Sequence, residues 1–131
     1  MLPIPLLPAP VNMTPNQGYR IDIERLRNQR NIVFNWMPVT GANAYVFSLF
    51  KQTAAGSRRM ITRTNPENRT SWTLENINEL TRGIFVWQVE AVNINLSGTV
   101  EQRGIIGEST FIIDIPLPEV QANTPGLLYG N

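Results

Sequence analysis

The stretch that decides the fold is Leu80–Asn93, which reads LTRGIFVWQVEAVN. A turn sequence leads into a run rich in aromatic and β-branched side chains, which are typical of strands. Successive strand residues point to opposite faces, so four apolar residues share one face: Phe85, Trp87, Val89 and Ala91. Gln88 and Glu90 make the other face at least partly solvated. The stretch therefore predicts a central strand of an antiparallel sheet with one face on a core.

The composition is that of one folded domain without a strong electrostatic field. The chain has 131 residues, of which 42% are hydrophobic and 16% charged, and this balance excludes a disordered chain. Its net charge is +1, so no overall field attracts nucleic acid or an anionic membrane. No apolar run reaches the length of a membrane span. We expect neither a nucleic-acid partner nor membrane insertion.

The residue inventory argues against catalysis. The chain has no Cys and no His, which removes disulfides, thiolate-bound metal, the commonest general base and the commonest metal ligand. No phosphate-binding glycine loop is present, and Asp and Glu are scattered. We expect a non-enzyme with no cofactor, no catalytic residue and no metal site. One enzymatic arrangement stays open, namely two carboxylates that converge in a cleft.

Further short strands lie on both sides of the central one. Alternating or β-rich runs separated by turn sequences predict strands at 19–24, 31–36, 45–50, 60–64, 71–74 and 110–115. Residues 25–31 are expected to turn, 54–59 to form a hairpin loop, and 75–82 to form a single helical turn. About seven strands without a long amphipathic helix predict an all-β, two-sheet antiparallel β-sandwich. Its three tryptophans are expected to meet between the sheets.

Proline-rich segments flank the expected sandwich, which spans residues 8–115. Residues 1–18 contain five prolines and predict an extended linker that leads into an edge strand, with no signal peptide. Residues 116–131 predict a second linker. They share Leu-Pro, Thr-Pro, Gly and Tyr with residues 7–19. A genuine repeat would make this tail the start of another copy of the module, so that the chain is one part of a longer protein; chance similarity is the alternative.

Four motifs in order across residues 8–115 resemble fibronectin type III domains, in particular the bacterial variants. They are IVFNWMPV, GANAYVF, TSWTL and LxxGxFxWxVxA, the last running from Leu80 to Ala91. The resemblance implies an immunoglobulin-like sandwich with Trp36 and Tyr45 in the core. The family often has Tyr where this chain has Phe85, so the hydrogen bond of a tyrosine corner is absent and Phe85 packs with Leu80 instead. The family's integrin-binding Arg-Gly-Asp tripeptide is also absent.

The glycine-containing stretch Asn95–Ser109 is the expected contact surface. Sandwich folds place recognition on end loops because the sheets hold those loops in position. Within this loop, Arg103, Ile105 and Ile106 are the candidate protein-contact residues, since an exposed apolar pair marks a contact with a partner or a neighbouring domain. The alternative is a hairpin extension in which both isoleucines are tucked over the sheet edge.

A second charged feature is the basic sequence around Arg58, Arg59 and Arg63, with Lys51 nearby. A nucleic-acid surface would need exposed aromatic residues between such charges. Because the aromatic residues are expected in the core, a solvated hairpin tip is the better interpretation.

Together these features favour a spacer or adhesion-type module of a larger cell-surface, periplasmic or secreted protein. Its partners would be neighbouring domains or another protein. The alternative is a carbohydrate-binding module, which shares the sandwich architecture but needs solvent-exposed Trp or Tyr residues in a row. Burial of Trp36, Trp72 and Trp87 would remove most of the support for that alternative.

Overall fold

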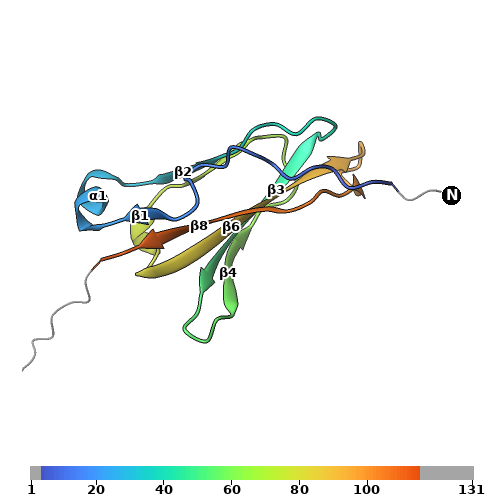
Figure 1. Ribbon diagram of the computed structural model, residues 1–131. Coiled ribbons are helices and arrows are strands. Elements are labelled where there is room, and N and C mark those ends of the chain that lie inside the picture. The colour runs from blue at the N-terminus through green and yellow to red at the C-terminus, as the bar shows by residue number, and fades with distance from the viewer. Residues whose placement is uncertain (1–3, 116–131) are drawn as a thin grey trace, which may run out of the picture.

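A computed structural model describes residues 4–115; the expected C-terminal linker, residues 116–131, and its similarity to residues 7–19 lie outside the described residues. Strands dominate the described chain (Figure 1). In order, the elements are β1 (Tyr19–Ile21), α1 (Ile23–Asn28), β2 (Ile32–Asn35), β3 (Ala44–Gln52), β4 (Arg58–Arg63), β5 (Ser71–Leu74), the 3-10 turn η1 (Ile77–Glu79), β6 (Gly83–Ile94), β7 (Val100–Gln102) and β8 (Gly107–Ile113).

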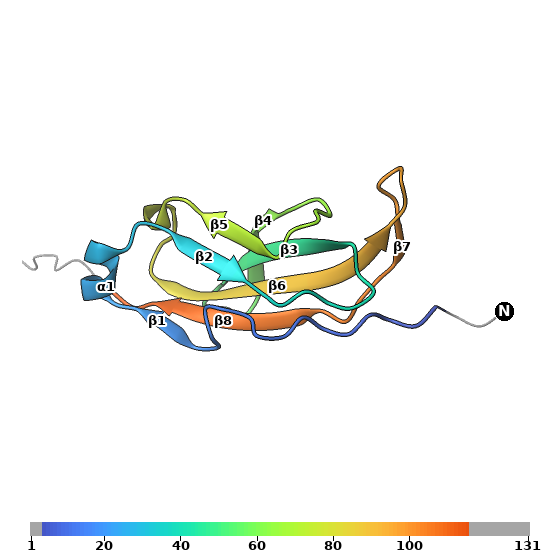
Figure 2. The ribbon, with the colours of Figure 1, turned by 90° about the horizontal axis from the view of Figure 1, so that it is seen from above.

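The strands form two sheets that face each other (Figure 2). The larger sheet has the order β1-β8-β6-β3-β4, with β7 also pairing with β6, and the smaller sheet is β2-β5. As predicted, β6 is central, antiparallel to both β3 and β8. Among the strand pairs between residues 4 and 115, β1–β8 alone is parallel. The predicted all-β two-sheet sandwich is confirmed, with this one parallel pair added.

The core between the sheets is centred on Phe34 of β2. Its ring lies 5.0 Å from both Phe47 and Trp87 and 5.7 Å from Phe111, measured between centroids. Such aromatic pairs contribute about 0.5–1.5 kcal/mol beyond the area they bury. The face of β6 that was predicted to be buried is fully buried. The smaller sheet thus contributes the rings of Phe34 and Trp72 to an aromatic cluster that packs on the larger sheet.

Two of the three tryptophans lie inside this core. Trp36 and Trp87 are 5% and 0% exposed, and their rings are 6.5 Å apart. Trp72 of β5 is half-buried and stacks on Phe47 at 4.7 Å. Within the described chain, the indole nitrogens of Trp36 and Trp87 have no hydrogen-bond partner, so packing alone favours these two side chains.

The chain between β1 and β2 is helical, whereas a strand to residue 24 and then a turn were predicted. The strand ends at Ile21 because Asp22 caps a helix: its carboxylate accepts a hydrogen bond from the backbone N–H of Arg25 at 2.9 Å. Ile23, which the alternation placed on the buried face, is 42% exposed. The prediction was wrong because the alternation continues across a residue whose short carboxylate favours a helix start.

Other boundaries differ by a few residues. β4 begins at Arg58, inside the predicted hairpin loop, and β8 begins at Gly107 rather than residue 110. β7 turns the middle of the predicted loop 95–109 into a hairpin extension. The expected helical turn is present as η1, which buries Ile77.

The N-terminal segment, residues 7–19, is docked on the sandwich. Leu7 is 6% exposed, donates its backbone N–H to the carbonyl of Arg103 (3.0 Å) and accepts from the N–H of Ile105 (2.8 Å). Farther along, Thr14 exchanges two backbone hydrogen bonds with Asn35 of β2, at 2.9 and 2.8 Å. The segment thus contacts the larger sheet, crosses to the smaller one and returns as β1. The two ends of the described chain lie at opposite ends of the elongated sandwich (Figures 1 and 2).

Candidate contact surface

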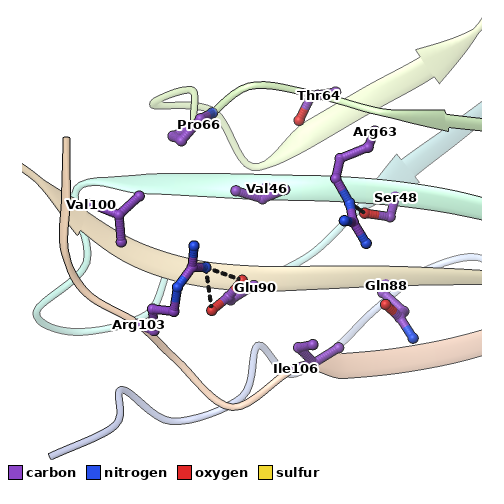
Figure 3. A pocket seen from close by; sticks show the side chains of 10 residues that line it. All are labelled: Val46, Ser48, Arg63, Thr64, Pro66, Gln88, Glu90, Val100, Arg103 and Ile106. Carbon is purple, nitrogen blue, oxygen red and sulfur yellow. Dashed lines mark hydrogen bonds and ion pairs between the residues drawn. The ribbon is translucent and has the colours of Figure 1, made fainter. Parts of the chain in front are cut away.

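The outer face of the larger sheet carries a cleft of about 390 Å³, here called the outer cleft (Figure 3). Strand alternation forms it, since residues between the core positions of β3 and β6 point outward. Its floor consists of Val46, Ser48, Gln88 and Glu90. One wall is Arg63 with Thr64 and Pro66, which follow β4, and the other is Val100, Arg103 and Ile106.

An ion pair crosses one end of the outer cleft. One guanidinium nitrogen of Arg103 donates to both carboxylate oxygens of Glu90, at 3.0 and 3.1 Å. The Glu90 side chain is only 15% exposed, whereas that of Arg103 is 62% exposed. A carboxylate that has lost most of its water needs such a partner. Arg103 therefore neutralises the half-buried Glu90 carboxylate, while the rest of the Arg103 side chain is exposed to solvent.

The opposite wall holds a second guanidinium. Nε of Arg63 donates to Oγ of Ser48 at 2.9 Å, and Ser48 is 3% exposed. Within residues 4–115 no carboxylate lies within ion-pair distance of Arg63. The terminal nitrogens of Arg63 consequently remain available to an acceptor from outside the domain.

A third arginine is neutralised beyond the floor of the outer cleft. Arg58 makes a bidentate contact with Glu108, at 2.9 and 3.2 Å, and Gln88 donates to the same carboxylate at 2.8 Å. These hydrogen bonds, that of Arg58 first, lower the pKa of Glu108 from its ordinary value, and Glu108 in turn raises the pKa of Arg58. The contact joins the end of the β3–β4 hairpin to β8.

Of the three candidate residues from the sequence, Arg103 and Ile106 line the outer cleft and Ile105 does not. Both isoleucines are 51% exposed. Ile105 lies beside the N-terminal segment, where its N–H bonds to Leu7. The structure therefore divides the candidates between two surfaces.

Sequence reasoning missed Ser48, Arg63 and Glu90 as members of one site. The outward alternation of Ser48 and Glu90 was readable in the sequence, but the strand register that brings them beside Arg63 was not. This register also separates the members of the basic sequence. Arg63 pairs with Ser48 on the outer face, whereas Arg59 pairs with Lys51, three residues farther along β3. Lys51 instead reaches over the ring of Phe85, 5.7 Å from its centroid, and bonds to Thr81.

The chemistry of the outer cleft suits binding. Among the described residues, no three His, Cys, Asp or Glu side chains gather in a way that could hold a metal ion. Glu90 is the one carboxylate among the ten residues that line the cleft, and none of the ten is aromatic. No helix in residues 4–115 has the length and apolar character needed to cross a membrane.

Searches of protein-family models and of curated proteins gave no match to this chain.

Proposed function

We propose that this protein is a non-catalytic interaction and spacer module that binds another protein through the outer cleft. The observation that carries the proposal is that one concave surface combines Arg63, which has no carboxylate partner among residues 4–115, with apolar side chains of Val46, Val100 and Ile106. Exposed apolar residues beside an arginine are characteristic of protein-contact surfaces.

The chemistry of the cleft specifies the kind of partner. Two guanidinium groups face one carboxylate, so the outer cleft favours an acidic residue. The apolar side chains favour a hydrophobic neighbour of that residue. The partner is therefore a protein segment in which Asp or Glu, bonded to Arg63, lies next to an apolar side chain that packs on Ile106. A charge-assisted hydrogen bond of this kind contributes about 1.5–3 kcal/mol.

The carbohydrate-binding alternative has less support. Stacking on sugar rings requires exposed aromatic faces, yet Trp36 and Trp87 are buried, and Trp72 is half-buried with its ring stacked on Phe47. The outer cleft has no aromatic residue that could replace them.

The wider proposal is a fibronectin type III-like module of a larger cell-surface, periplasmic or secreted protein. Two observations support it. The motifs that resemble that family lie on the strands of a two-sheet sandwich. The two ends of the described chain lie at opposite ends of the sandwich, which suits a spacer because neighbouring domains would extend in line (Figure 1).

Selection from a peptide library displayed on phage tests the binding proposal with the protein as it is. We expect the enriched peptides to carry Asp or Glu beside an apolar residue. The substitution Arg63→Gln should weaken their binding at least tenfold, as should Ile106→Ser. Arg20→Gln is the matched control, since Arg20 pairs with Asp114 and does not line the outer cleft. Peptides that bind both cleft variants as well as the unaltered protein, or no enrichment at all, would overturn the proposal.

A further inference from the structure

Strand β4 is a free edge of the larger sheet. It stands last in the order β1-β8-β6-β3-β4, and among the described strands it pairs with β3 alone. In Figure 1 the β3–β4 hairpin projects from the rest of the sandwich. Five of the six residues of β4 are exposed, and Thr62 is half-buried. Backbone N–H and C=O groups on the open side of such a strand form a template for pairing with another chain.

The composition of β4 selects what can pair with it. The strand contains Arg58, Arg59 and Arg63 and no acidic residue, and only Arg58 is neutralised, by Glu108. A register shift also leaves Ile61 as an extra residue against β3. Charges and bulges of this kind keep edge strands from pairing with their own copies, because like charges would face one another. The same arginines attract an acidic strand, so the edge discriminates between the two.

A second cleft, here called the inner cleft, lies beside β4 and has a volume of about 240 Å³. It is on the face opposite to the outer cleft. Lys51 continues the alternation of the core residues Phe47 and Leu49, whereas Ser48 points into the outer cleft. The inner cleft is lined by residues of β3, β4, β6 and the turn before β6, namely Lys51, Arg59, Met60, Ile61, Glu79, Leu80, Thr81 and Phe85.

The inner cleft has the same kind of chemistry as the outer one. Lys51 and Arg59 pair in the strand register and outnumber the one carboxylate, Glu79. Within residues 4–115 none of these three side chains takes part in an ion pair. Met60 and Ile61, which are 47% and 38% exposed, supply an apolar wall. Cations in excess beside apolar side chains therefore flank β4 on both faces.

Two clefts on opposite faces of one free edge match the side chains of an added strand, which alternate between faces. We propose that an extended acidic segment of the partner protein pairs with β4 and directs its side chains alternately into the outer and inner clefts. Residues opposite each other on neighbouring strands have Cβ atoms about 4.5–5.5 Å apart, so acidic side chains reach Arg63 on one face and Arg59 on the other. The proposal rests on the proposed function for the outer cleft and adds the mode of binding and a second cleft.

The synthetic peptide Thr-Glu-Val-Ile-Glu-Val-Thr tests the proposal, because its two glutamates lie on opposite faces of a strand, each with an apolar neighbour. Fluorescence anisotropy of the labelled peptide measures its affinity for the 131-residue protein. N-methylation of alternate residues removes the N–H groups along one edge of the peptide. We expect one of the two methylation patterns to weaken binding at least tenfold and the other to have little effect. Amide hydrogen exchange within β4 should slow when the peptide binds.

Side-chain variants locate the contacts. Arg59→Gln should weaken peptide binding at least fivefold. Arg30→Gln is the matched control, since it removes the same charge from an exposed residue that lines neither cleft, and it should leave binding unchanged. The peptide with lysine in place of both glutamates should not bind.

Strand addition is wrong if the unmethylated peptide does not bind, if both methylated peptides bind as well as it does, or if exchange within β4 is unchanged on binding. Self-association of the free protein that Arg59→Gln strengthens would assign the edge to a second copy and would also overturn the proposal. Arg63→Gln and Ile106→Ser report on the outer cleft in the same assay. If only these two variants weaken binding and both methylation patterns are tolerated, the outer cleft stands and strand addition fails. If one methylation pattern and Arg59→Gln weaken binding but these two variants do not, the outer cleft fails instead.

Discussion

Gly104→Ala should release the N-terminal segment from the sandwich. Gly104 is required for space, since its φ is not among the positive values of the described glycines. A Cβ atom at this position would lie 2.4 Å from the carbonyl oxygen of Ala91 and 3.3 Å from Cβ of Leu7. Ala91 belongs to the central strand β6 and is paired with Tyr45 of β3 on the side away from Gly104, so residues 103–105 must move outward instead.

The contacts of Leu7 set the size of the effect. Movement of residues 103–105 stretches two hydrogen bonds, from the N–H of Leu7 to Arg103 and from the N–H of Ile105 to Leu7, each worth about 0.5–1.5 kcal/mol. It also exposes the Leu7 side chain, whose burial contributes about 1.5–3 kcal/mol. Because part of each contact survives in a displaced segment, we expect Gly104→Ala to lower the free energy of unfolding by about 2–4 kcal/mol.

Urea unfolding followed by tryptophan fluorescence measures this loss, and hydrogen exchange at the amides of Leu7 and Ile105 shows where it occurs. Gly98→Ala is the control: Gly98 has a φ of 85° and open space around it, so only backbone strain of about 1–2 kcal/mol is expected, with unchanged exchange at Leu7. A cost for Gly104→Ala below about 1 kcal/mol, or unchanged protection at both amides, would refute the reasoning.

Three further predictions concern the core, the pH dependence and the helix. Trp87→Ala should cost about 3–5 kcal/mol in urea unfolding because the side chain is fully buried among rings; a cost below about 1 kcal/mol would contradict its place in the core. Because the folded state lowers the pKa of Glu108, its contribution is present above the unfolded value of about 4.3 and is lost as the pH falls through the folded pKa. Arg58→Gln should therefore lessen the fall in urea midpoint between pH 7 and pH 3, and an unchanged fall would exclude this ion pair as its source. Asp22→Ala should cost about 1 kcal/mol through loss of the cap on α1, measured in the same way, and stability equal to the parent would mean that the cap contributes nothing.

The sequence predicted well wherever one face of a strand is buried. In β6 and β2 the period-two pattern survives because core packing leaves no other arrangement, and the residues expected inside, such as Phe34 and Trp87, are there. The pattern failed at Asp22, where a local hydrogen bond to the backbone outweighs an alternation that continues to Ile23. The pattern also predicted too short a strand at β8. Gly107 and Glu108 lack β propensity and are strand residues only because they pair with β6.

The outer cleft was only partly predictable for a different reason. Arg103 and Ile106 stand out in the sequence as charged and apolar residues among glycines. Arg63 and Ser48 are fifteen positions apart and meet through the register of β3 with β4, which includes a shift between Leu49 and Phe50. Register depends on the whole set of sheet contacts, so no local pattern specifies it.

The parallel pairing of β1 with β8 has a mechanical consequence. A force that stretches the protein from its ends pulls β1 toward its own N-terminus and β8 toward its C-terminus. Since these strands run in the same direction side by side, that load slides one along the other. The hydrogen bonds between Tyr19–Ile21 and Phe111–Ile113 then share the load and must break together, with the parallel bridge between Leu7 and Gly104 as a second restraint. Stretching from the ends should consequently meet more resistance than pulling across the sheet, and single-molecule unfolding forces that are equal in both directions would contradict this. A module with this arrangement would keep its length under tension.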